Sequence, residues 1–233
     1  MLNIANIEFA RKRFEKVNNY YGAKGLAPQL SLLRIEETLV NGQGVYNFDL
    51  KKETGSLSVV ESNLKRNDLF VTLALGVFLR VDNTAKPGVN QLMTYPLIKA
   101  DATAAGIGFT TSDIESLYNG KLYVATGNTV NIADMPTMLF KKVGQAANAV
   151  SQPVFDFKND LCDMAEEIVF AGTQDHKIQV SFPTFANADY SSSAAANTAG
   201  VSKICFTALG YRVVGGTEET YRTDSSNPYK GAI

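Results

Sequence analysis

The chain has 233 residues, of which 45% are hydrophobic and 19% charged, so it is long enough to bury a core and disorder is excluded. Its 22 basic and 23 acidic side chains leave a net charge of −1, which excludes a global field that would recruit nucleic acid or an anionic membrane. One histidine, no tryptophan and two cysteines without CxxC spacing leave little material for acid–base, metal or disulfide chemistry.

The first 26 residues predict an N-terminal amphipathic helix or arm. Apolar side chains recur at spacings of three and four from Ile7 to Tyr21, which is the period of a helix with one apolar stripe. Gly22 and Gly25 follow and are typical of a helix end. The opposite face is expected to carry the basic side chains Arg11, Lys12, Arg13 and Lys16. No signal peptide or membrane-spanning segment is predicted.

From residue 30 onward the apolar period changes to two, which predicts strands. Residues 30–40 and 45–50 are expected to form a hairpin around an Asn-Gly turn. The strongest strand is 68–81, where every odd-numbered residue is leucine or valine and is expected on one face. Phenylalanine and alanine add apolar character to the other face. This strand is therefore predicted to be central and buried on both sides.

The middle of the chain predicts a short helix and a second hairpin. Residues 112–118 begin with a serine and have a glutamate three positions later, the pattern of a capping box. Residues 121–125 and 129–133 are expected to pair as a hairpin around a Gly-Asn turn.

The sequence of the last third of the chain predicts a pair of strands, a long final strand and a tail. Residues 167–171 and 177–182 are expected to pair around a short turn, and residues 189–200 to form a mobile loop of small side chains. Residues 203–214 predict a long final strand. The polar residues 217–233 follow as a C-terminal tail.

About eight main strands and one long helix predict an all-β protein. Such a strand count favours an antiparallel two-sheet jelly-roll sandwich with an N-terminal amphipathic helix. The expected organisation is a helix or arm over 1–26, a sandwich over 27–216 and a tail over 217–233.

The residues for catalysis are largely missing. The lone histidine, His176, is expected in a surface turn, and neither a Gly-x-Ser-x-Gly elbow nor a phosphate-binding loop occurs. Adjacent carboxylates would point to opposite faces of a strand, and we expect them to be solvated; the pairs are Glu36-Glu37, Glu166-Glu167 and Glu218-Glu219. No enzyme activity, metal or cofactor is therefore predicted.

Two features leave alternatives open. Four tyrosines could be exposed and stack on sugars, although packing in the core and on sheet faces is the favoured interpretation; they are Tyr20, Tyr21, Tyr190 and Tyr211. The basic helix face is either the solvated side of a docked helix, which we favour, or a surface that meets nucleic acid or lipid inside an assembly.

Three segments carry a family resemblance: residues 33–36 (LRIE), 67–71 (NDLFV) and 206–214 (FTALGYRVV), following a basic helix. In this order the chain resembles the jelly-roll major capsid proteins of icosahedral viruses, and more narrowly those of tailless bacteriophages with an internal membrane. The resemblance spans most of residues 6–216. It lies in strand order and in the polar tail, since no catalytic or metal signature defines the family.

The resemblance implies a structural virion protein that self-assembles into an icosahedral shell through trimeric or hexameric capsomers. Its partners would be copies of itself, other virion proteins and, weakly, the genome or an internal membrane, with assembly in the host cytoplasm. No small-molecule substrate is expected. The tail would act as an inter-subunit arm, with Thr217, Tyr221, Arg222 and Tyr229 as contacts.

The chain is shorter than the common double-barrel form of that family. A single jelly roll, a compact double one, or a minor shell, spike or head-fibre component all remain open. The alternative from another class is a carbohydrate- or receptor-binding β-sandwich, such as a spike, fibre or lectin-like module.

Overall fold

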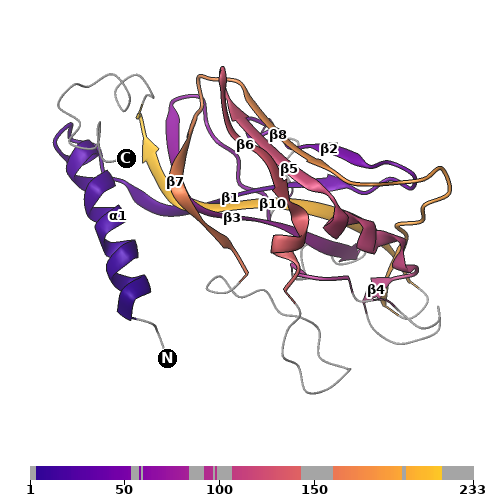
Figure 1. Cartoon of the computed structure of the whole chain (residues 1–233). Helices are drawn as coiled ribbons and strands as arrows, with labels where there is room; N and C mark the ends of the chain where they lie inside the picture. The colour runs from indigo at the N-terminus through magenta and orange to yellow at the C-terminus, as the bar shows by residue number, and fades with distance from the viewer. Residues whose placement is uncertain are drawn as a thin grey trace.

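The computed structural model describes residues 4–53, 58, 60–83, 92–96, 98, 107–142, 160–195 and 198–216 (Figure 1). Helix α1 spans Ile4–Gly22, and two 3₁₀ helices, η2 and η3, span Ser112–Asn119 and Thr137–Phe140. The strands are β1 Gln29–Thr38, β2 Val45–Asn47, β3 Asp68–Asn83, β4 Gly108–Phe109, β5 Lys121–Thr126, β6 Thr129–Pro136, β7 Cys162–Ala171, β8 His176–Ser181, β9 Ser192–Ala195 and β10 Thr198–Val214.

Two antiparallel sheets make up the fold, which confirms the predicted all-β class. Sheet A has the order β4-β9-β10-β3-β7, and β1 also pairs with β10; sheet B has the order β2-β8-β5-β6. Apolar side chains of both sheets meet in one core, for example Ile35 and Phe206 of sheet A and Val124 and Val180 of sheet B. The sheets therefore enclose the core between them (Figure 1).

Several strands pair with distant partners and not with their neighbours in sequence. β1 pairs with β10 and β2 with β8, so the predicted hairpin of residues 30–40 and 45–50 is wrong. The predicted pair of 167–171 and 177–182 is wrong for the same reason, because β7 pairs with β3 and β8 with β2 and β5. In both places the short connection carries the chain from one sheet to the other.

β3 is the central strand that the sequence predicts, but a bulge changes its faces. It lies between β10 and β7, and its first 14 residues are buried. The pairing with β7 shifts between Thr72 and Ala74. Before the shift, Leu69, Val71 and Leu73 face α1, whereas the odd-numbered residues from Leu75 onward face the core. The expectation that all odd-numbered residues share one face is therefore wrong, because a bulge reverses the alternation.

The predictions for the shorter elements are partly confirmed and partly wrong. β5 and β6 form the predicted hairpin, and the turn between them uses Gly127 at φ +54°. η2 lies where a helix was predicted, but Thr111 precedes it and no side chain caps it. The predicted capping box is therefore wrong. Residues 189–200 are not simply a loop, since they contain β9 and the start of β10, with Ser192 buried.

Helix α1 packs against the face of sheet A that points away from the core. Val17, Tyr20 and Tyr21 are buried there against residues of β3, β7 and β10, including Leu69 and Val213. Figure 1 shows α1 at one end of the sandwich. We call this the α1 end; β3 starts here, β7 and β10 finish here, and the β7–β8 connection turns here. The opposite, far end holds the β1–β2 connection.

The close approach of β10 and β3 predicts a sharp cost for a side chain at Gly210. A Cβ built there would lie 2.1 Å from the carbonyl oxygen of Val71, so Gly210→Ala must displace backbone. We expect a loss of about 1–3 kcal/mol in the free energy of unfolding, measured by urea denaturation. Gly22→Ala is the control, because nothing lies within 4 Å of its Cβ. Equal stability of both variants would contradict this packing.

Candidate functional site

The four basic side chains of α1 do not share one solvated face, contrary to the prediction. Arg11 is 77% exposed and pairs with Glu15, and Lys12 is exposed. Arg13 is buried, at 8% exposure. Lys16 lies 2.8 Å from a carboxylate oxygen of Glu167 on β7. Only Arg11 and Lys12 therefore remain available to a partner outside the chain.

Arg13 anchors α1 to the bulge of sheet A. Its Nη1 donates a hydrogen bond of 3.2 Å to the carbonyl of Leu73, and its Nη2 donates to the carbonyl of Met164. Both carbonyls lie where the β3–β7 pairing is irregular, so the guanidinium supplies donors that the ladder lacks. The sequence held a signal for this role, because Arg13 stands four and seven positions before Val17 and Tyr20, on the buried face.

Removing the Arg13 guanidinium should loosen α1 from the sheet. Arg13→Gln leaves one buried and one partly buried carbonyl with weaker partners. We expect faster amide hydrogen exchange over residues 4–22 while the core strands keep their protection. Arg11→Gln, which removes an exposed cation from the opposite side of the same helix, is the matched control. Unchanged exchange in Arg13→Gln would show that the apolar contacts alone hold the helix.

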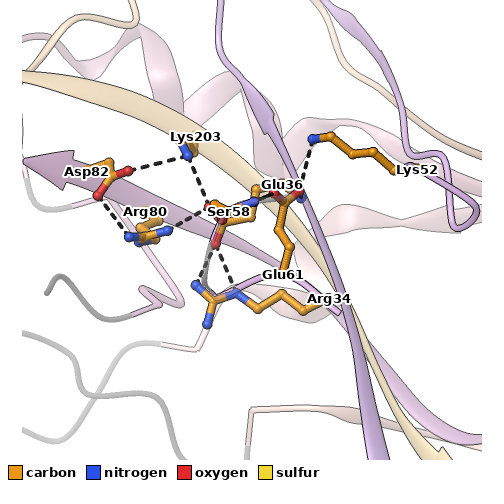
Figure 2. A network of polar contacts seen from close by, with 8 residues as sticks. All are labelled: Arg34, Glu36, Lys52, Ser58, Glu61, Arg80, Asp82 and Lys203. Carbon is orange, nitrogen blue, oxygen red and sulfur yellow. Dashed lines mark hydrogen bonds and ion pairs between the residues drawn. The ribbon is translucent and has the colours of Figure 1, made fainter. Parts of the chain in front are cut away.

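A network of buried charges occupies the outer face of sheet A further from α1 (Figure 2). Arg80 of β3 and Glu36 of β1 form an ion pair of 2.6 Å, and each side chain is 1% exposed. Lys203 of β10 lies 3.3 Å from Glu36 and 3.4 Å from Asp82. Arg80 also donates to Asp82 at 2.8 Å. The expectation that Glu36 is solvated is therefore wrong.

The network continues along the edge of β1 that lies away from β10 (Figure 2). At this edge Arg34 forms an isolated antiparallel bridge with Ser62. Arg34 donates to Glu36 at 2.6 Å. Glu61 accepts from the backbone N–H groups of Glu36 and Ser58 and from the ammonium of Lys52. Burial raises the pKa of Glu61, but these donors outweigh burial and hold its pKa below the ordinary value. Glu61 is thus a fixed carboxylate at neutral pH.

This cluster of ion pairs is better suited to stabilising the sheet than to catalysing a reaction. Three cations contact the carboxylate of Glu36, so its oxygens are engaged. The partners come from three strands that lie side by side, β1, β10 and β3. The cluster therefore ties adjacent strands together and presents no free base or nucleophile.

Removing one buried cation from this network should lower the stability of the fold. Arg80→Met leaves Glu36 and Asp82 without their principal buried cation, and we expect a loss of about 3–5 kcal/mol in unfolding free energy. The control is Lys121→Met, which removes the exposed pair with Asp134; Lys121 is 62% exposed, so the loss should stay below about 1 kcal/mol. Chemical denaturation measures both, and equal losses would contradict a burial effect.

The other candidate residues are mostly buried. His176 is the first residue of β8 and not part of the turn; its Nε2 lies 2.7 Å from the carbonyl of Ala171 and its ring packs edge-on against Phe170. Burial lowers its pKa. The tyrosines considered for sugar stacking are all buried, namely Tyr20, Tyr21, Tyr190 and Tyr211.

Two open cavities lie at opposite ends of the sandwich. The first has a volume of about 410 Å³ at the α1 end and is lined by residues 51–53, 63–66 and 172–173. The second, of about 390 Å³, lies at the far end between residues 44–45, 119–121 and 181–184. Neither was expected from the sequence, because each is formed by segments that are distant along the chain.

Thr217, Tyr221, Arg222 and Tyr229, expected as an inter-subunit arm, lie outside the described residues. In the described ranges, no three His, Cys, Asp or Glu side chains gather as a metal site requires. None of the helices seen there is long and apolar enough to cross a membrane.

No protein-family model matches the chain, and neither a curated protein nor a solved structure is significantly similar to it. Function must therefore be inferred from the geometry of this chain.

Proposed function

We propose that this chain is a structural virion protein, a self-assembling subunit of an icosahedral shell, with a single jelly-roll sandwich. The observation that carries the proposal is the nested order of strand pairing. Without the short β4 and β9, the described part of the chain has eight strands. The first pairs with the last, the second with the seventh, the third with the sixth and the fourth with the fifth.

This nesting is the pattern of one long hairpin rolled into two facing sheets. Two further pairs join its layers, β10 with β3 and β8 with β5. A jelly roll is an eight-stranded sandwich of two Greek keys that occurs in viral capsid proteins, lectins and cupins. The strand order supports this fold, and the choice among its uses depends on the surface.

The surface favours contact with other protein chains over sugar binding. The four tyrosines considered for sugar stacking are buried, so they offer no stacking platform. At the far end, by contrast, Val40, Val45 and Phe185 are exposed. Their segments are adjacent, since Gly42 donates to the carbonyl of Ala188. Grouped exposed apolar side chains mark interaction surfaces.

We propose a second copy of the chain as the partner for this far-end surface, within a trimeric or hexameric capsomer of the virion. Closed symmetric assemblies are the common form of self-association. Other virion proteins would complete the shell, which assembles in the host cytoplasm. Arg11 and Lys12 are the α1 cations left for an inner-face contact with genome or membrane. The role is structural and needs neither catalysis nor cofactor.

Self-association is the direct test of this proposal. Light scattering coupled to size-exclusion chromatography should show oligomers that grow with concentration, and negative-stain microscopy should show capsomers or particles. Phe185→Asp should shift the chain to monomer by placing a charge in the contact.

Leu30→Asp is the matched control, because Leu30 is an exposed leucine at the α1 end. It should assemble like the unmodified chain. A chain that stays monomeric at every concentration and salt, with no particles, would overturn the proposal.

A further inference from the structure

The cavity at the α1 end is lined by charged side chains to which the proposed function gives no role. Residues 51–53 reach it after β2, residues 63–66 before β3, and residues 172–173 where β7 turns into β8. Its volume of about 410 Å³ falls in the range of small-molecule sites. It is open to solvent, so a ligand would have access.

Cations dominate its lining on a chain whose net charge is −1. The basic lining residues are Lys51, Lys52, Lys65 and Arg66, and the single acidic one is Glu53. Lys51 pairs with Asp175 at 2.7 Å and Lys52 with Glu61 at 3.1 Å.

Lys65 and Arg66 differ from the two paired lysines. Both are exposed, and within the described part of the chain neither has a carboxylate at ion-pair distance. Among the described residues, these two cations therefore line the cavity without a carboxylate to balance their charge.

The segments that carry these cations are held in place by backbone contacts. The N–H of Leu64 donates to the carbonyl of Leu50 at 2.7 Å, and the Asn63 amide donates to the carbonyl of Lys52 at 2.7 Å. Leu64 is itself buried in the core. The two walls of the cavity are therefore tied to each other.

The third wall of the cavity, residues 172–173, packs directly against the second wall, residues 63–66. A Cβ at Gly172 would lie 2.0 Å from the carbonyl oxygen of Lys65, so only glycine permits this approach. The N–H of Gly172 donates to the backbone carbonyl of Asp68 at 2.9 Å, and the N–H of Asp68 donates to the backbone carbonyl of Lys65 at 3.0 Å. The backbone beside the free cations is thus fixed before any ligand arrives, which lowers the ordering cost of binding.

We propose that this cavity binds a phosphate group, with Lys65 and Arg66 as its principal donors. A guanidinium presents a planar fork that matches two phosphate oxygens, and an ammonium adds a compact point charge. The phosphate could belong to a free phosphate or to a phosphodiester backbone, which share this chemistry. The inference is independent of assembly, because it concerns the isolated chain.

The test uses the full-length chain and two probes. A fluorescein-labelled single-stranded DNA oligonucleotide is titrated by anisotropy at several salt concentrations, and inorganic phosphate is titrated by calorimetry. We expect Lys65→Gln and Arg66→Gln each to weaken binding several-fold. If the oligonucleotide is the ligand, each should also lower the salt slope by about 0.7. Both side chains are exposed, so circular dichroism should show unchanged folding.

Lys121→Gln is the control, because it removes one exposed charge at the far end, and it should bind like the unmodified chain. Oligonucleotide binding that depends on both residues identifies a phosphodiester ligand; phosphate binding alone that depends on them identifies a free phosphate. Either result supports the site. The absence of both, or equal losses in the control, overturns it, whether or not the chain assembles.

Discussion

The antiparallel pairing of β3 with β10 is the interaction on which the rest of the structure depends. It runs from Asn83 opposite Gly200 to Asp68 opposite Val214. β7 is placed by β3, and β1 and β9 by β10. The ion pair of Glu36 and Arg80 spans this arrangement, because β1 and β3 lie on either side of β10. A register slip of one residue would turn these charges into the core, so the network opposes slippage.

Local features of the fold could be predicted from the sequence. The continuous apolar run of β3 indicated a central strand, and the Gly-Asn turn after β5 indicated a hairpin, because in both cases the signal lies within a few residues. Pairing between distant strands carries no comparable signal. A turn sequence such as Asn41-Gly42 is equally suited to a hairpin and to a crossing between sheets, and the structure uses it for the crossing.

The candidate site was harder to predict, because burial of charge depends on tertiary context. Glu36 and Arg80 are polar residues in apolar strands, and nothing local indicates that they meet across an intervening strand. Arg13 is different, since its helical spacing from Val17 already placed it on the buried face. An arginine is ordinarily expected to be exposed to solvent. In this fold the Arg13 guanidinium donates to the carbonyls of Leu73 and Met164, which lack strand partners at the bulge.

The two ends of the sandwich differ in charge more than in apolar exposure. Exposed apolar side chains occur at both ends, Leu30 and Val214 at the α1 end and Val40, Val45 and Phe185 at the far end. The α1 end also carries the helix and a cavity lined by cations. Folding alone does not require cations to gather at one end, because like charges repel one another. A subunit of a closed shell does require this, since its contacts to other copies and to packaged material must lie on different surfaces. This asymmetry links the nested strand order to the proposed assembly and places the proposed phosphate site away from the contact between copies.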